Sequence, residues 1–341
     1  MRPLAAVPLA LSLLAAAPAA ALAAPATTPA TAQEFGPARP VTVREFVLTY
    51  DVRVKDVPKD AKSVRVWLPM PMSTVLQEVS NPRIDPAATP IRFVSDDPYG
   101  TRFLLLELAP PPEGGTTAPV TVAFTVLRKG YRGLAPLAGQ GSRVPAERWL
   151  AADPRTPVDG AVAAAAHAAV GDATDPVAKA KRLFDALLAG AKLDPTGESW
   201  GAGDAASVLD VKAGGPRDLV ALFVGEARSV GVPARYVSGF VLPPAEKEGS
   251  LVYDEAWAEI KVEGKGWLPV DVVSGKRYPD AAEVYFGGVD EHRAQVALGR
   301  DIKVPEYPGP KQELVAWPLA AVDGSAVPPA KVDTALRFAP R

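Results

Sequence analysis

An apolar helix followed directly by antiparallel strands, between residues 214 and 273, restricts the fold more than any other feature of the sequence. Apolar side chains recur at helical spacing on one face of residues 216–230, at Leu219, Leu222, Phe223, Ala227 and Val230. Gly231 and Pro233 then supply a helix stop. The residues beyond predict strands at 235–242, 255–262 and 267–273. Helices followed by antiparallel strands indicate an α+β domain.

The sequence before this region begins with strand patterns. Phe46, Leu48, Tyr50, Val52 and Val54 alternate with a second, mostly polar set, and further apolar segments occur at 64–68, 103–108 and 120–126. Turns rich in Pro and Gly separate them. We therefore expect a β-sandwich-like N-terminal domain over residues 41–132, the α+β domain over 133–275, and a C-terminal extension over 276–341 that packs on the core. Strands are also predicted at 313–322 and 332–338.

Two further helices are predicted inside the α+β domain. An alanine-rich helix covers residues 158–170 and closes at Gly171. The next begins at Asp175, which has the residue type of an N-cap, and Pro176, which suits the first helical turn. These helices precede the helix that starts at Pro216.

The N-terminus predicts export. Arg2 is followed by the apolar run Leu4 to Leu14 and by the small-residue site Ala21-Leu22-Ala23, which together are typical of a secretory signal peptide over residues 1–23. The alternative is a membrane anchor, but the run is short and contains Pro8. Residues 24–40 are rich in Pro, Ala and Thr and predict a disordered linker. We expect a mature chain without a transmembrane segment, periplasmic or secreted after cleavage near Ala23.

Composition excludes several functions. The chain of 341 residues has 37 basic and 39 acidic side chains, a formal net charge of −2, which gives no electrostatic footprint for nucleic acid. It contains no cysteine, so thiol chemistry and disulfides are impossible. The only histidines, His167 and His292, lie far apart in sequence, so we expect neither a metal site nor a cofactor.

Four motifs resemble one known family. They are Gly214-Gly215-Pro216-Arg217-Asp218-Leu219, Gly231-Val232-Pro233-Ala234-Arg235, Glu255-Ala256-Trp257-Ala258-Glu259 and Gly266-Trp267-Leu268-Pro269-Val270-Asp271. The pattern resembles the transglutaminase-like superfamily, and residues 285–293 and 299–302 resemble the C-terminal part of its exported bacterial members. The resemblance implies a transglutaminase/papain-like α+β fold and, in active members, a Cys–His–Asp triad.

The resemblance places this triad on Pro216, Glu255 and Asp271. Proline has no nucleophilic atom, although it suits the start of a helix. Glutamate cannot replace the imidazole base, and next to Asp271 it forms a like-charge pair. Only Asp271 keeps its residue type. No catalytic triad is therefore intact, and we interpret these three residues as vestigial triad positions of a pseudoenzyme.

An enzyme of different chemistry is an alternative, with Glu255 and Asp271 as a general acid and base. It requires both carboxylates on one face of the hairpin. A two-residue turn at Gly264-Lys265 puts them on opposite faces, whereas a three-residue turn with a glycine bulge restores a common face. Glu255 is otherwise a solvated strand residue or an ion-pair partner of Arg217 or Arg235.

Four residues are candidates for lining a cleft. Trp257 and Trp267 are either core residues or a flat platform for a peptide or sugar. Asp218 places a favourable charge at the helix N-terminus, and Arg217 is placed to contact an acidic ligand at the cleft mouth. The sequence therefore predicts a non-catalytic exported module that binds a peptide, a protein or a cell-wall component. A scaffold that acts through the N-terminal β domain is a further alternative.

Overall fold

The computed structural model describes residues 42–341 apart from 81, 87, 96–98, 139–143 and 195–202. The predicted signal peptide (1–23) and linker (24–40) lie outside the described residues. Within the described ranges, no helix is long and apolar enough to cross a membrane.

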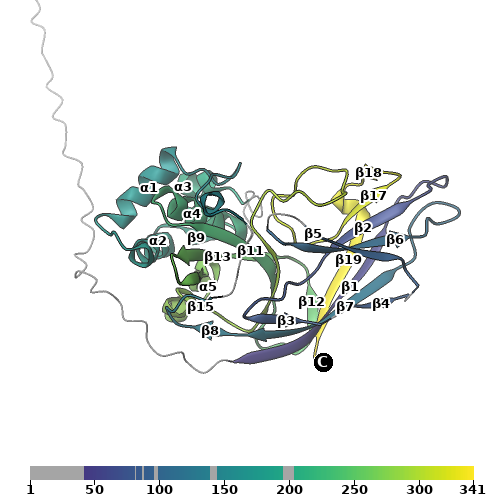
Figure 1. Cartoon of the computed structure of the whole chain (residues 1–341), viewed down its shortest axis with the longest axis horizontal. Coiled ribbons are helices and arrows are strands. Elements are labelled where there is room, and N and C mark those ends of the chain that lie inside the picture. Colours follow the sequence, from purple (N-terminus) through teal and green to yellow (C-terminus); the bar gives the residue numbers. More distant parts are fainter. Residues whose placement is uncertain (1–41, 81, 87, 96–98, 139–143, 195–202) are drawn as a thin grey trace, which may run out of the picture. The chain divides into compact units, whose positions relative to one another are not determined.

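Two antiparallel β-sheets form the N-terminal sandwich (Figure 1). In the first sheet the strands follow the order β12 (Gly249–Leu251), β19 (Val332–Ala339), β1 (Val43–Val54), β7 (Val120–Lys129) and β3 (Gln77–Val79), and β4 (Arg83–Asp85) also pairs with β7. In the second sheet the order is β18 (Ser325–Ala326), β17 (Leu319–Val322), β2 (Val64–Pro69), β6 (Arg102–Leu108) and β5 (Ile91–Ser95). The predicted strands of residues 41–132 are therefore present.

The alternation in β1 produces the core between these sheets. Phe46, Leu48 and Tyr50 are buried with Val66 and Leu104 of the second sheet. Successive side chains of a strand point to opposite faces, so one face of each sheet supplies this shared core. At about 25 cal/mol per Å² of apolar surface, such burial is the main source of stability in a chain without disulfides.

Chain order does not follow this sheet order. β19, near the C-terminus, pairs with β1 over Val47↔Ala339 to Val54↔Val332, and β17 pairs with β2. The C-terminal residues thus complete both sheets of the N-terminal sandwich. No local pattern reports such a pairing between the two ends of the chain.

The α+β part has helices on one face of a third sheet. Its helices are α1 (Gly160–Val170), α2 (Pro176–Gly190), α3 (Ala205–Val211), α4 (Pro216–Ser229) and α5 (Val272–Arg277). The sheet is antiparallel, in the order β14 (Gly266–Val270), β13 (Glu255–Val262), β11 (Ala234–Val241) and β16 (Arg293–Leu298). Leu219 and Phe223 of α4 pack with Ala258 and Ile260 of β13. This arrangement confirms the predicted α+β class.

The opposite face of this third sheet packs against the second sheet of the sandwich. Trp257, Trp267 and Val237 share a core there with Trp67 and Leu105. Short elements complete the fold: the strand pairs β8 (Tyr131–Arg132) with β15 (Gly288–Val289) and β9 (Lys192–Leu193) with β10 (Ala213–Gly214), and the 3₁₀ helices Ala146–Trp149, Pro279–Tyr285 and Pro329–Lys331.

The hairpin between β13 and β14 decides the register that the sequence leaves open. Val262 pairs with Gly266, so the loop has the three residues 263–265 and not the two of a Gly264-Lys265 turn. Gly264 and Gly266 have φ values of 69° and 129°, which favour glycine. Ala258 consequently pairs with Val270, and strand alternation puts Asp271 on the same face as Glu255.

Candidate functional site

The N-terminus of α4 is built for helix initiation. Gly215 is the N-cap and Pro216 the first helical residue, where a missing N–H removes no hydrogen bond. Asp218 is fully buried and accepts hydrogen bonds from the backbone N–H groups of Gly215 and Asp204, each at 3.0 Å. A carboxylate in this first turn is favoured by the helix dipole. Asp218 therefore places a charge in the first turn of α4 and also hydrogen-bonds to the backbone of its N-cap residue, Gly215.

Glu255, the first residue of β13, is 3% exposed and is held by an arginine. Arg277, at the end of α5, donates from Nη2 to Oε1 at 2.6 Å and from Nη1 to Oε2 at 3.3 Å. Burial raises the pKa of Glu255, the Arg277 guanidinium opposes this shift, and the nearby Asp271 charge adds to it. This two-point contact fixes both carboxylate oxygens.

Asp271 has two structural contacts. Its Oδ1 accepts from the Ser274 backbone N–H at 2.8 Å, which makes Asp271 the N-cap of α5. Its Oδ2 accepts from Arg293 Nη1 at 2.8 Å. Asp271 is 2% exposed and Arg293 is fully buried, so this ion pair is shielded from solvent.

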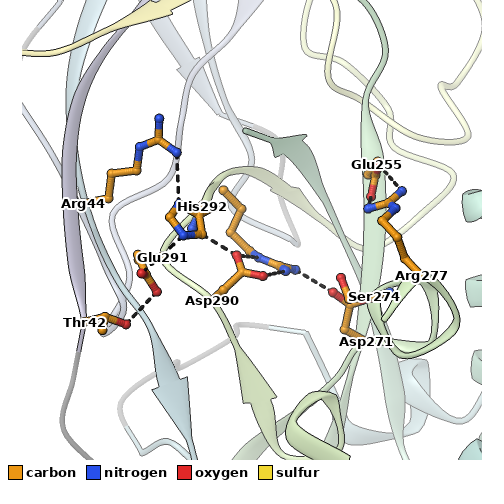
Figure 2. A network of polar contacts seen from close by, with 10 residues as sticks. Thr42, Arg44, Glu255, Asp271, Ser274, Arg277, Asp290, Glu291 and His292 are labelled. Carbon is orange, nitrogen blue, oxygen red and sulfur yellow. Dashed lines mark hydrogen bonds and ion pairs between the residues drawn. The ribbon is translucent and has the colours of Figure 1, made fainter. Parts of the chain in front are cut away.

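Arg293 joins Asp271 to Asp290. It donates from Nη2 to Asp290 Oδ2 at 2.7 Å and from Nε to Oδ1 at 3.1 Å, and it lies 5.0 Å from the Trp257 ring centroid. Although burial disfavours the charge on Asp290, the Arg293 guanidinium lowers the pKa of Asp290 to about 2. Burial opposes the charge on Arg293 too, but the two carboxylates raise its pKa. Figure 2 shows Asp271 and Asp290 on either side of the guanidinium group that both contact, beside the Glu255–Arg277 pair.

A close approach of two strands positions Arg293. The β11–β16 register shifts between Ser238 and Gly239, and a Cβ at Gly239 would lie 1.9 Å from the Ala294 carbonyl oxygen. Only glycine permits this approach. Gly239 also pairs with Glu255, so one bulge brings the start of β13 close to Arg293 and its carboxylate partners.

The predicted ion-pair partners of Glu255 are wrong. Glu255 is neither solvated nor paired with Arg217 or Arg235, because Arg217 pairs with Asp254 and Arg235 pairs with Glu259 at 2.6 Å. Asp254 also accepts from Trp317 Nε1 at 2.8 Å. Arg217 is thus already bound to a carboxylate, which does not favour the predicted contact with an acidic ligand.

The interpretation of Trp257 and Trp267 as a ligand platform is also wrong. They are 1% and 5% exposed and lie in the core on the sheet face away from α4. The Arg235 guanidinium lies 3.8 Å from the Trp267 ring centroid and covers its face. Both rings are core residues, and neither closes the sheet against the helix.

Sequence reasoning missed three residues of this network: Arg277, Arg293 and Asp290. Residues 285–293 carry part of the family resemblance, but nothing local indicates that Arg293 reaches Asp271. The pattern Asp290-x-x-Arg293 indicates at most a local ion pair. His292 joins this network through its backbone, because its N–H donates to Asp290 Oδ1 at 3.0 Å. Its ring contacts other residues: Nδ1 is 3.0 Å from Arg44 Nη1, and Nε2 is 3.4 Å from Glu291 (Figure 2). Across the described residues there is no group of three or more His, Cys, Asp or Glu side chains placed to hold a metal ion.

Residues 163–272 match the sequence profile of the transglutaminase-like superfamily. The chain contains a transglutaminase-like domain. It is 24% identical over 252 residues to an "Uncharacterized protein" of Haemophilus influenzae, a match that covers 67% of this chain and 68% of that protein. A "Putative Cysteine Protease" from Cytophaga hutchinsonii has a TM-score of 0.55 at 15% identity, over 88% of this chain and 92% of that chain, and therefore shares the fold.

At the three positions predicted to correspond to the Cys–His–Asp triad, this transglutaminase-like domain carries Pro216, Glu255 and Asp271. Pro216 offers no nucleophile, and Glu255 and Asp271 are each hydrogen-bonded to a buried or half-buried arginine. General acid–base catalysis needs a carboxyl group that can exchange a proton with substrate. The observed contacts instead hold both groups in ion pairs.

Proposed function

We propose that this transglutaminase-like protein is non-catalytic and acts after export by binding a peptide, a protein or a cell-envelope component. The observation that carries the proposal is the ion-pair network over the vestigial triad positions. Pro216 begins the helix where active members have their thiol, and Arg277 and Arg293 hold the two carboxylates. The absence of any cysteine supports the same conclusion.

Two-carboxylate catalysis is the weaker alternative. The hairpin register puts Glu255 and Asp271 on a common face, which that reaction requires. Asp271, however, already caps α5 and pairs with Arg293, and Glu255 pairs through both oxygens with Arg277. A general acid would have to lose such contacts before it could protonate a substrate. The contacts favour a structural role for both residues.

The proposal is tested by assaying purified mature protein for hydrolysis of amide and glycoside substrates and for acyl transfer. We expect neither hydrolysis nor acyl transfer above the uncatalysed rate. Asp271→Asn and Glu255→Gln are assayed in parallel, because activity from a contaminant is the same in all three preparations. Turnover by the natural chain that is lost in either variant would refute a non-catalytic function.

Export is tested on the full chain. Residues 1–23 are proposed to direct secretion, so the mature protein should lack them, and its N-terminal sequence should begin close to Ala24. Replacing Leu11 and Leu13 in the apolar run with Asp should keep the chain in the cytoplasm. Unchanged export of that variant would contradict the assignment.

A further inference from the structure

Strand β5 lies at an open edge of the second sheet. It pairs with β6 through Ile91↔Leu106 to Ser95↔Arg102. Pro90 C=O accepts from the Glu107 N–H at 3.0 Å, so by antiparallel alternation the residues at 92 and 94 bond to β6. The backbone groups of Ile91 and Phe93 therefore point away from β6. Among the described residues, no strand pairs with this edge.

The same two residues expose apolar side chains on the inner face of the sandwich. Ile91 and Phe93 pair with Leu106 and Leu104, which belong to the core between the sheets. Yet Ile91 is 36% exposed and Phe93 is 61% exposed. Exposed apolar side chains on a strand with one open edge are unfavourable in water and are typical of a surface that another chain covers.

A pocket of about 460 Å³ adjoins this face. Its lining includes Met70, Met72, Val79, Phe93, Val94 and Arg102. Val79 comes from β3, at the edge of the first sheet, so the pocket lies between the edges of the two sheets. Methionine side chains adapt to different apolar partners. This lining fits aliphatic side chains that enter from a neighbouring strand.

Arg102 supplies the charge of the pocket. It pairs with Ser95 across the sheet and therefore faces the same side as Phe93. It is exposed, and within the described part of the chain no carboxylate bonds to it, in contrast to Arg92, which pairs with Glu306 at 2.7 Å. The small side chain of Ser95 separates Arg102 from the open edge. A long acidic side chain from an added strand can cross that distance.

We propose that β5 is a docking edge for an extended segment of a partner protein. The segment adds a strand beside Ile91–Ser95, inserts alternate apolar side chains next to Phe93, and places a glutamate on Arg102. Backbone hydrogen bonds supply affinity, and the apolar pocket and the guanidinium supply selectivity. This inference rests on the proposed binding function and names its surface and the chemistry of its partner.

A labelled peptide of alternating valine and threonine with a glutamate at one end tests the proposal on the mature chain. Both orientations are synthesised, with glutamate first or last, because the added strand can run either way. Anisotropy measures Kd, and hydrogen exchange measures protection of the Ile91 and Phe93 amides. We expect binding with protection of both amides. Phe93→Ser should weaken binding about tenfold, since a buried aromatic contact is lost.

Arg102→Gln should also weaken binding about tenfold, and replacing the peptide glutamate with glutamine should remove that difference. Val211→Ser is the matched control, because Val211 is 62% exposed and lies on α3, and it should leave Kd unchanged. Absence of binding, or binding that is indifferent to both Phe93→Ser and Arg102→Gln, would overturn the docking edge. A Phe93-dependent dimer that excludes the peptide would overturn it in favour of a second copy.

Mass analysis of the peptide after the titration separates the two proposals. An intact peptide that binds at the edge supports both. A cleaved or cross-linked peptide, abolished by Asp271→Asn, would refute the non-catalytic function, whatever the result at β5. An intact peptide with no affinity would overturn the docking edge alone.

Discussion

Replacing Asp271 with asparagine removes its ion pair with Arg293 but keeps its N-cap hydrogen bond to α5, so the contribution of the ion pair can be measured separately. Asparagine keeps an oxygen at the Oδ1 position, which can still accept from the Ser274 N–H, and Asn and Asp are similar N-caps. At the Oδ2 position, however, an N–H₂ group would face Arg293 Nη1, so two donors would oppose each other across 2.8 Å. The substitution therefore removes one carboxylate from a fully buried guanidinium.

The expected loss of stability is about 2–4 kcal/mol. Breaking a buried ion pair from one side usually costs about 3–5 kcal/mol, and here Asp290 remains as a second partner of Arg293, which reduces the cost. Urea denaturation at pH 7, with linear extrapolation, measures the change in unfolding free energy. The same variant should show unchanged, negligible hydrolytic activity, because we assign no catalytic step to Asp271.

Asp204→Asn is the matched control. Asp204 caps α3 through the N–H groups of Ala206 and Ser207, and it has no arginine partner among the described residues. Its change to asparagine should cost less than about 0.5 kcal/mol. If Asp271→Asn is no more destabilising than Asp204→Asn, the buried pair with Arg293 does not stabilise the fold as argued here.

Four further substitutions test individual charges. Burial lowers the pKa of Arg128 to about 9, and no described carboxylate bonds to this guanidinium group. Arg128→Met should therefore raise the free energy of unfolding, measured by urea denaturation, by about 1–4 kcal/mol. Arg235→Met should lower it, because Glu259 would then be buried without its ion-pair partner. Burial raises the pKa of Glu226 from 4.5 to about 8, so the stability of the fold decreases as the pH rises between these values. Glu226→Gln should therefore stabilise the fold by about 3 kcal/mol at pH 7 but by less than about 1 kcal/mol at pH 5. Although burial opposes the charge on Asp290, Arg293 lowers the pKa of Asp290 from 3.8 to about 2. This carboxylate should therefore contribute about 2 kcal/mol to the free energy of unfolding above pH 3.8, and the wild type should lose that contribution as the pH falls to 2. Asp290→Asn should not show this loss.

The sequence predicts most elements because their patterns are local. The alternation of β1, the Asp175 N-cap, which accepts from the Ala178 N–H at 2.8 Å, and the start of α4 at Pro216 all appear in the structure. Each depends on residues within one turn or one strand. The pairing of β19 with β1 depends on residues almost 300 positions apart and leaves no such local pattern.

The candidate site is less predictable for the same reason. Which arginine meets Glu255 depends on where α5 ends after the hairpin, and the three-residue loop sets that position. Arg235 lies on the neighbouring strand β11 and Arg217 lies at the start of α4, but their guanidinium groups already bind Glu259 and Asp254. Burial then enforces pairing, because an unpaired buried carboxylate is costly.

Asp271 shows why a retained residue type is poor evidence of retained chemistry. In a Cys–His–Asp triad an aspartate orients the histidine, yet here the position of that histidine is Glu255, which Asp271 repels rather than orients. The contacts of Asp271 are instead with the Ser274 backbone and Arg293. Both contacts stabilise the fold even in a protein that catalyses no reaction. Loss of stability, not loss of turnover, is therefore the effect that its substitution should produce. An aspartate with these contacts stabilises the fold whether or not the domain is catalytic, since removing it would leave Arg293 short of a partner and α5 without its cap.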